Sequence, residues 1–298
     1  MTIQSTIEKD TRSVKSVRWG QERRLEFIDF RLLWEGRINR GEIVDFFGIS
    51  IQQASLDIAR YVELAPLNLE YDKSEKVYRS TTAFKPSITP PETQAYLNQL
   101  LGLAVGTLLP SMSFVGWRPP CDVVRFPTRP IRSSILVSVL WAIRDKEEIE
   151  LTYQSMRRPA ATRRWIAPHA IAFDGARWHA RAWCQENNDF RDFVFSRIQD
   201  IHSSRKTLID EQTDENWHTF IDVILRAREG LTEHQRLAIQ ADFGMQDGQL
   251  VIHTRNALAF YLLRQLQLDR SLEQSIQAQP IELVNVDELS PILERARK

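Results

Sequence analysis

Hydrophobic and polar residues alternate over most of residues 149–201, which is the pattern of β-strands. The pair Asp174-Gly175, between two alternating segments, is a strong hairpin signal. Over residues 177–184 the alternation assigns every second side chain to the same face of one strand. The face expected in the core carries Trp178, Ala180, Ala182 and Cys184, and the opposite face carries Arg177, His179, Arg181 and Trp183. This stretch is predicted to be a small β-domain.

The N-terminal third of the chain has helical periodicity instead. Apolar residues recur three and four positions apart, which predicts helices over residues 21–34, 40–47 and 51–64. A tight turn, Gly48-Ile49-Ser50, separates the last two, and this arrangement is the helix-turn-helix signature. Residues 1–17 are polar and lack periodicity, so we expect them to be mobile. The inward stripe of the third helix is predicted to contain Ile51, Ala54, Ile58, Ala59 and Val62.

Two short alternating segments, residues 67–71 and 77–79, follow the third helix and predict the wing of a winged helix-turn-helix domain. In such a domain the third helix enters the DNA major groove with its N-terminal side chains against the bases. Gln52 and Gln53 stand at that end, and glutamine can form two hydrogen bonds with adenine. Basic residues of the wing could reach phosphates. The candidate DNA-binding residues are Ser50, Gln52, Gln53, Ser55, Arg60, Lys73, Lys76 and Arg79.

The remaining segments mix helical and strand-like patterns. Thr89-Pro-Pro-Glu92 has the form of a capping box, so we expect a helix from there to about residue 109. Its apolar face is predicted to contain Tyr96, Leu97, Leu100, Leu101, Ala104 and Val105. Residues 110–130 are rich in proline and predict a linker with a hydrophobic anchor around Phe114 and Trp117. Further helices are expected over residues 131–144, 217–227, 257–266 and 288–297, and strands over residues 233–241, 250–252 and 280–284.

Composition is that of an ordinary soluble protein, with 43% hydrophobic and 26% charged residues and a net charge of zero. Acids outnumber bases in residues 207–298, whereas the middle of the chain is cationic, which suggests different partners for each part. Cys121 and Cys184 lack metal-ligand spacing, and we expect both to be buried, reduced thiols. The chain has no signal region and no apolar run long enough for a membrane span, so a cytoplasmic location is expected.

Arginine is concentrated in the β-domain. Residues 157–197 contain eight arginines and no lysine, a choice that favours bidentate recognition of phosphate or carboxylate. An alternative interpretation is a solvated strand face. The sequence lacks a glycine-rich phosphate loop, a His/Cys cluster and a hydrolase serine motif, so we predict neither an enzyme nor a bound metal or cofactor.

The β-domain resembles a WYL domain, the Sm-like β-barrel of many bacterial transcriptional regulators. The matching motifs are Tyr153-x-Ser155, Arg164-x-Ile-x-Pro168-His169, Asp174-Gly-x-Arg177-Trp178 and Phe195-Ser-Arg197-Ile198. The signature triplet keeps Trp178, but His179 and Ala180 replace its Tyr and Leu. This departure is similar to a branch of repressors found beside phage-defence islands such as BREX and CBASS operons. The resemblance extends over the flanks and covers nearly the whole chain.

The resemblance implies that this surface binds a nucleotide or nucleic-acid ligand and controls the DNA-binding domain. By alternation Trp178 faces the core, so it is expected to support the pocket without touching the ligand. His179 exchanges a stacking phenol for a titratable donor, which leaves the identity of the ligand open. The candidate ligand-binding residues are Tyr153, Ser155, Arg164, His169, Arg177, Trp178, His179, Arg181, Phe195 and Arg197.

The sequence therefore predicts a multidomain α+β protein. Its expected parts are a winged helix-turn-helix domain (residues 1–86), a helical linker (87–145), a WYL ligand-sensing domain (146–204) and a C-terminal dimerisation extension (205–298). The predicted function is that of a homodimeric repressor, which binds a palindromic double-stranded operator and is controlled by an anionic ligand. Two alternatives remain open. One is a ligand-dependent activator of the same architecture, and the other is an accessory protein that binds single-stranded nucleic acid.

Overall fold

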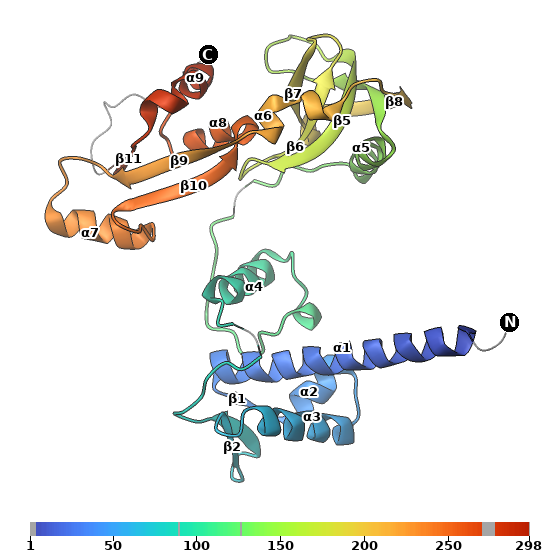
Figure 1. The fold of residues 1–298 in the computed structure, drawn as a ribbon, viewed down its shortest axis with the longest axis vertical. Helices are drawn as coiled ribbons and strands as arrows, with labels where there is room; N and C mark the ends of the chain where they lie inside the picture. The colour runs from blue at the N-terminus through green and yellow to red at the C-terminus, as the bar shows by residue number, and fades with distance from the viewer. Residues whose placement is uncertain (1–3, 89, 126, 270–277, 298) are drawn as a thin grey trace. The chain divides into compact units, whose positions relative to one another are not determined.

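The computed structural model describes residues 4–88, 90–125, 127–269 and 278–297, and helices and strands are interspersed throughout. The chain divides into two units, Met1–Pro127 and Thr128–Lys298 (Figure 1). The predicted α+β, multidomain class is confirmed. Over the described residues, no helix has the length and apolar character needed to cross a membrane.

The first unit contains the helix-turn-helix at the predicted residues. Gly48 ends the second helix with φ 63°, in the left-handed region that favours glycine, and the Ser50 hydroxyl accepts a hydrogen bond from the Gln53 amide to cap the third. The wing strands also form. The elements are α1 (Gln4–Glu35), β1 (Arg37–Ile38), α2 (Arg40–Phe47), α3 (Ile51–Leu64), β2 (Leu69–Asp72) and β3 (Val77–Ser80).

Helix α1 is longer than the sequence pattern predicted. It begins at Gln4, so residues 4–17, to which the sequence pattern assigned no element, belong to this helix. An apolar stripe marks only the packed part of a helix. Once that part has formed, each further residue that joins the helix adds one backbone hydrogen bond. A polar segment can therefore continue the helix.

The inward face of α3 is also rotated from the prediction. Ala54 and Ile58 are buried as expected, but Ile51, Ala59 and Val62 are exposed. Their places are taken by Asp57 and Tyr61, which are completely buried. The core of this unit therefore includes polar groups, which a search for apolar residues alone does not find.

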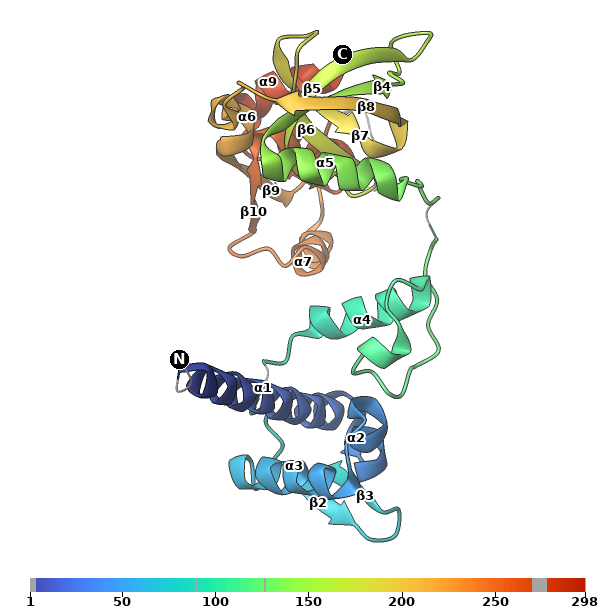
Figure 2. The same ribbon diagram turned by 90° about the vertical axis from the view of Figure 1, so that its right-hand side faces the viewer.

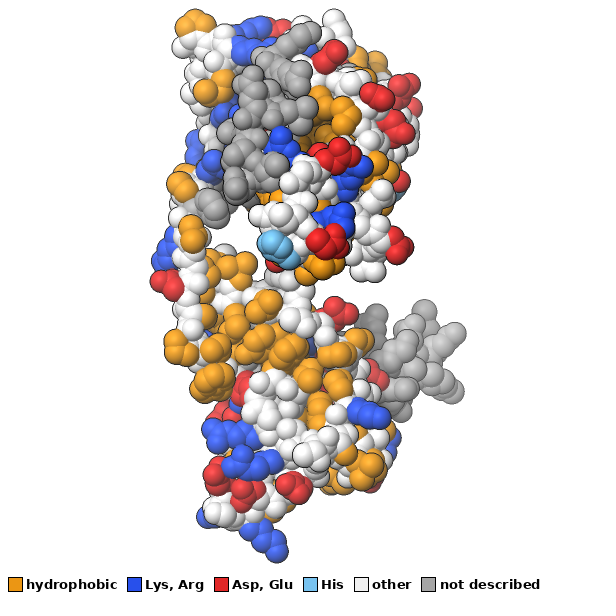
Figure 3. All heavy atoms as spheres, turned by 90° about the vertical axis from the view of Figure 1, so that its left-hand side faces the viewer, with side chains coloured by type: hydrophobic (Ala, Val, Ile, Leu, Met, Phe, Trp, Pro, Cys, Tyr) orange, Lys and Arg blue, Asp and Glu red, His pale blue; other side chains and the backbone are white. Residues whose placement is uncertain are grey.

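Helix α4 (Thr93–Val105) begins later than predicted, since Glu92 is its N-terminal flanking residue and provides no side-chain cap. Thr89 lies outside the described residues. Only Leu100 of the predicted apolar face is buried, and Leu97, Leu101 and Val105 are close to half exposed. Hydrophobic side chains accordingly gather on the surface over α4 (Figure 3).

The segment after α4 packs back onto the winged helix. It contains the short helix η1 (Pro110–Met112), and Phe114 enters the same core as α1 and α2. The predicted anchor is confirmed at Phe114, whose ring meets Phe27 edge-on at 5.2 Å between centroids. Trp117, by contrast, is exposed.

The second unit begins with α5 (Ser133–Asp145), which packs along a five-stranded antiparallel sheet (Figure 2). Ile135 and Val139 bury its inner face. The strand order is β7-β6-β5-β4-β8, and within the described residues β7 and β8 do not pair to close the predicted barrel. The strands are β4 (Glu147–Tyr153), β5 (Thr162–Phe173), β6 (Trp178–Cys184), β7 (Asp189–Val194) and β8 (Ile198–Lys206), with η2 (Phe195–Arg197) between the last two.

Strand β6 follows the predicted alternation with one exception. Ala180, Ala182 and Cys184 are fully buried in the sheet core. Trp178 is 46% exposed, so the expectation that it faces the core was wrong. It is the first residue of the strand and pairs with Phe173 at the end of β5, beyond the buried cluster. Cys121 is exposed, which also differs from the prediction.

The C-terminal part contains a second antiparallel sheet of order β10-β9-β11. Two predictions were reversed here: residues 220–227 form a strand within the segment predicted to be a helix, and residues 233–242 form a helix. The helices and strands predicted near residues 250, 260, 282 and 290 are confirmed. The elements are η3 (Glu211–Thr213), α6 (Glu215–His218), β9 (Phe220–Ala227), α7 (Glu233–Asp242), β10 (Gln249–Arg255), α8 (Asn256–Gln265), β11 (Ile281–Leu283) and α9 (Val286–Arg297).

One face of this second sheet is buried and the other is open. Val223 and Leu225 point to the core formed with α8 and α9. Their strand neighbour Ile224 pairs with Val251 on the opposite face, where Val251 is 53% exposed. Helix α8 also buries Ala259 and Leu263 inside its own chain.

Candidate functional site: a recognition helix and a buried anion site

The N-terminal end of α3 is accessible, as a DNA-reading helix requires. Gln52 is exposed there. Gln53 is half-buried, and its side-chain amide donates to Asp57 at 3.1 Å. Ser50 is occupied as the helix cap, and Ser55 donates to the Ile51 carbonyl at 2.9 Å. Of these predicted residues, Gln52 therefore has its side chain most available for a base.

The wing presents a basic turn. Lys73 and Lys76 are exposed between β2 and β3. Arg79 is held within the wing, with its guanidinium 3.0 Å from Asp72 and 2.7 Å from Glu75. Arg60, on α3, likewise pairs with Glu63 at 2.7 Å. Lys73 and Lys76 are consequently better placed for phosphates than the two arginines.

A buried ion pair fixes α3 against α1. The Asp57 carboxylate is fully buried and accepts two hydrogen bonds from Arg24, at 2.6 and 3.2 Å. The same carboxylate holds the Gln53 amide. This pair sets the orientation of the recognition helix. The sequence did not predict it, because a carboxylate at a helix position suggests a solvent-facing side chain.

In the second unit, Arg181 on β6 forms the centre of a charged cluster. Its guanidinium donates to both oxygens of Asp214, at 2.7 and 2.8 Å, and to Asp192 at 3.2 Å. His169 on β5 lies 3.0 Å from Asp214 through Nε2. Burial opposes charge on Asp214, but the hydrogen bonds from Arg181 and His169 outweigh it and hold the pKa of the carboxyl below its ordinary value. Arginine and histidine therefore form an anion site here, and a carboxylate of the same chain occupies it.

A second carboxylate holds the neighbouring part of the cationic face. Asp174 accepts from His179 Nε2 at 2.8 Å and from the Arg177 side chain at 3.0 Å. Its burial alone would raise the pKa, but these bonds and the backbone amides of Ala176 and Arg177 lower it to about 2. The ring of His179 also lies 5.1 Å from that of Tyr261, on α8.

The other predicted ligand residues are not gathered at one place. Tyr153 and Phe195 are buried in the sheet core, where the Tyr153 hydroxyl accepts from the Val194 amide at 3.2 Å. Arg164 lies over the Tyr153 ring at 5.5 Å and donates to Thr162. The remaining three are peripheral: Trp178 is exposed at the start of β6, Ser155 accepts from the Arg157 amide, and Arg197 is half-buried in η2.

Three residues of the cluster were not predicted from the sequence: Asp214, Asp192 and Tyr261. The Tyr261 hydroxyl donates to Asp192 at 2.8 Å, and so connects α8 to β7. Asp214 caps α6 by accepting from the Trp217 amide at 3.2 Å. An aspartate just before a short helix was the available signal for Asp214. No local signal places it on Arg181.

We expect the second unit to lose stability in acid through Asp174. Its pKa is about 2 in the folded protein against an ordinary value of 3.8, so its stabilisation is present above pH 3.8 and is lost as the pH falls towards 2. The loss should be roughly 2 kcal/mol. Chemical denaturation between about pH 5 and about pH 2 measures this loss of stability. The Asp174→Asn variant should show a weaker pH dependence, and an unchanged dependence would contradict this assignment.

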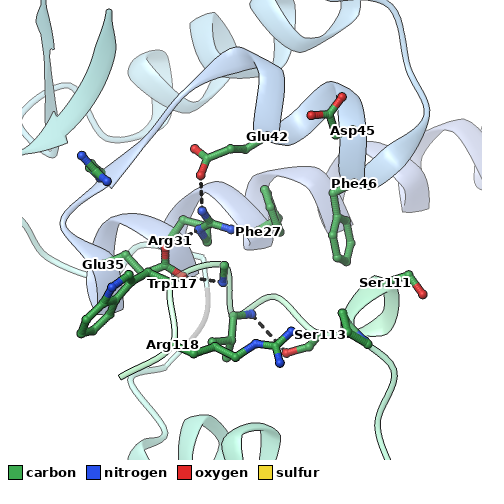
Figure 4. Close-up of a pocket in the computed structure, with 14 residues that line it drawn as sticks. Phe27, Arg31, Glu35, Glu42, Asp45, Phe46, Ser111, Ser113, Trp117 and Arg118 are labelled. Atoms are coloured by element: carbon green, nitrogen blue, oxygen red, sulfur yellow. Dashed lines mark hydrogen bonds and ion pairs between the residues drawn. The ribbon is translucent and has the colours of Figure 1, made fainter. Parts of the chain in front are cut away.

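A cavity of the first unit lies elsewhere, between α1, α2 and the segment after η1 (Figure 4). It has a volume of about 880 Å³. Arg31 in its wall pairs with both Glu35 and Glu42. Burial raises the pKa of Glu35, whose carboxylate also accepts from the Gly116 amide. The cavity walls thus join the linker to the winged helix, and none of the predicted site residues lines them.

Three family descriptions match the chain in sequence order. The BrxR transcriptional regulator winged helix-turn-helix domain matches residues 20–102, and the WYL domain matches residues 134–203. The BrxR transcriptional regulator C-terminal dimerization domain matches residues 220–289. The resemblance to WYL-domain regulators, inferred above from motifs, is confirmed.

Similarity to individual proteins extends over almost the whole chain. The DNA-binding transcriptional repressor CapW of Escherichia coli (strain KTE188) is 43% identical over 282 residues, or 94% of each chain. The Pseudomonas aeruginosa repressor of the same name is 42% identical over 281 residues, again 94% of each chain. That of Stenotrophomonas maltophilia is 43% identical over 264 residues, or 88% of each chain. The chain belongs to the CapW family of WYL-domain transcriptional regulators.

Proposed function

We propose that this protein is a homodimeric transcriptional repressor that binds a palindromic operator of a phage-defence operon in the cytoplasm. An anionic ligand, either a nucleotide or a nucleic acid, controls its DNA binding at the WYL domain, and the protein acts as a regulator and not as an enzyme. The similarity to CapW repressors over 94% of the chain carries the proposal. We place the domain boundaries after residues 86, 145 and 204.

The geometry of α3 supports operator reading. The helix is held by a buried ion pair, while Gln52 at its N-terminal end is exposed. A helix in this position can lie in the major groove, and a glutamine there can form two hydrogen bonds with adenine. Lys73 and Lys76 supply phosphate contacts from the wing, which add affinity without sequence preference.

The open face of the C-terminal sheet supports dimerisation. A three-stranded sheet with one uncovered face leaves Phe220 and Val251 exposed, on the segment that matches a dimerization domain. Packing the same face of a second chain on it would bury both side chains around a two-fold axis. Two recognition helices would then meet half-sites spaced by about one helical turn of DNA, or a multiple of it.

The buried anion site supports ligand control. Arg181 and His169 present hydrogen-bond donors in the bidentate arrangement that suits phosphate as well as carboxylate. The site lies between the WYL sheet and α6, which leads directly into the C-terminal sheet. A ligand bound there could alter the dimer, and through it the affinity for a two-fold operator.

Gln52→Ala should weaken binding of the specific operator by about 1–3 kcal/mol while leaving random duplexes unaffected, because it removes a base contact. Fluorescence anisotropy with both duplexes measures this difference. An equal loss on operator and random duplex would remove the base-reading role from Gln52.

Lys73→Ala should have the opposite signature. It removes a phosphate contact, so the affinity for every duplex should fall, and the slope of log affinity against log salt should shrink by about one. The test is a salt titration of the wild type and of the variant on both duplexes. A loss confined to the operator would mean that Lys73 reads sequence or shape.

A further inference from the structure

Strand β6 places three nitrogen-bearing side chains on one face, and two of them, His179 and Arg181, contact the C-terminal part of the same chain. His179, Arg181 and Trp183 alternate with the buried Ala180 and Ala182, so they follow one another at about 6.6–7 Å. His179 and Arg181 are almost completely buried. Such a row can contact successive polar groups of one extended ligand.

The middle position of this row is filled by a carboxylate. Asp214 accepts from two nitrogens of Arg181, at 2.7 and 2.8 Å, and lies 3.0 Å from His169 Nε2. The Arg181 guanidinium thus makes two parallel hydrogen bonds to the carboxylate, and His169 lies against one of the same two oxygens. Proteins use this arrangement to bind a phosphate as well. Asp214 therefore has the position and the charge of an anionic ligand.

The two flanking positions have unused polar atoms. His179 Nδ1 and Trp183 Nε1 are buried and have no hydrogen-bond partner among the described residues. Buried side-chain nitrogens are bonded in the large majority of cases, so two orphans on one strand face need an explanation. His179 donates through Nε2 to Asp174, and Nδ1 would meet an anion only as a protonated donor. An anion that extends to either side of Arg181 would satisfy both atoms.

Asp214 also belongs to the connection between the two sheets. It caps α6, through the Trp217 amide, and α6 continues into β9 of the segment that matches the dimerization domain. A second contact, Tyr261 to Asp192, fastens α8 to the WYL sheet beside it. Release of Asp214 from Arg181 would thus detach the start of the C-terminal part from β6.

We infer that the ligand's phosphate group takes the place of the Asp214 carboxylate on Arg181 and His169, with His179 and Trp183 as flanking donors. This inference rests on the proposed function, since it names how the anionic ligand binds and what it displaces. Asp214 is then a built-in competitor that keeps the site closed in the ligand-free repressor. Ligand and Asp214 exclude each other, so binding is coupled to the contacts that hold the C-terminal part in place.

The test compares full-length wild type with Asp214→Asn. Asparagine keeps the size of the side chain and the helix cap, but removes the charge that competes with the ligand. The probes are ADP and a labelled single-stranded DNA oligonucleotide, which distinguish a nucleotide from a nucleic-acid source of the phosphate. Asp214→Asn should bind the effective probe about tenfold more tightly, within the range of coupled sites.

Two further variants make the result specific. Asp210→Asn removes the same charge four residues earlier, at an exposed cap of η3, and should leave probe affinity unchanged. Arg181→Lys keeps the charge but loses the bidentate geometry, and should weaken probe binding. If Asp214→Asn does not fold, Asp214→Ser removes the same charge and keeps a capping hydroxyl.

The outcomes separate this inference from the proposed function. If the wild type binds a probe through Arg181 but Asp214→Asn and Asp214→Ser bind it no better, the competitor role is wrong and ligand control stands. If neither probe binds any of the variants, or if Arg181→Lys binds as the wild type does, the anionic ligand at this face is wrong and the competitor role falls with it.

Discussion

Asp57→Ala is expected to destabilise the winged helix by about 3–5 kcal/mol, because it removes the fully buried partner of the Arg24 guanidinium, whose side chain is only 13% exposed. The same change frees the Gln53 amide, which Asp57 holds. Operator binding should be lost together with the fold of this unit. Hydrogen–deuterium exchange measures α1 and α3 separately from the rest of the chain, and both should lose protection in the variant.

Glu63→Ala is the matched control for that experiment. It removes a carboxylate from the same helix, but the Glu63–Arg60 pair is exposed, and exposed pairs contribute at most about 1 kcal/mol. Protection of α3 and operator affinity should both stay near the wild-type values. If Asp57→Ala behaved like Glu63→Ala, the ion pair with Arg24 would have no part in positioning the recognition helix.

Val251→Glu is expected to separate the dimer and to lower operator affinity by about 10²–10⁴-fold, the range in which linked binding modules exceed a single one. Val251 is 53% exposed on the open face of the C-terminal sheet, so a charge there costs little in the monomer. Against the same face of a second chain, it would be buried without a partner. Sedimentation velocity and anisotropy on the same preparations measure assembly and DNA binding.

Leu237→Glu is the control for the dimer surface. Leu237 is similarly exposed, but it lies on α7, outside the sheet. Its variant should remain dimeric and bind the operator normally. A dimeric Val251→Glu protein would move the interface away from the sheet face, and a monomeric Leu237→Glu protein would extend it to α7.

The helix-turn-helix could be predicted from sequence almost to the residue because its signals are local. Gly48 and Ser50 end one helix and begin the next, and both act within a few residues of their position. The buried Asp57 could not be predicted in this way. Its partner Arg24 stands 33 positions earlier, and only the packing of α1 on α3 brings them together.

In the C-terminal part, the sequence pattern did not distinguish a helix from a strand. Residues 220–227 carry apolar side chains at spacings that suit both a helix and a strand, and pairing with β10 and β11 decides for the strand. The helix at 233–242 did have a local signal, a capping box formed by Thr232 and Gln235, which the apolar pattern obscured.

The candidate ligand site was predicted in part from a local pattern and in part depends on contacts between distant residues. Alternation along β6 correctly placed His179 and Arg181 on one face, opposite Ala180 and Ala182. It suggested an open cationic surface, whereas the structure covers that surface with Asp214 and Tyr261. These residues come 33 or more positions after Arg181, so no pattern within the strand could indicate them.

A dimeric, sequence-specific repressor must distinguish its operator from other DNA of the same composition. Fluorescence anisotropy of the full-length protein tests this most directly, with a duplex from upstream of its own operon and a shuffled duplex of equal length and composition. We predict that two protomers bind one two-fold symmetric site at least ~10³-fold more tightly than the shuffled duplex at the same salt concentration. Equal affinity for the two duplexes would contradict a role as a sequence-specific repressor.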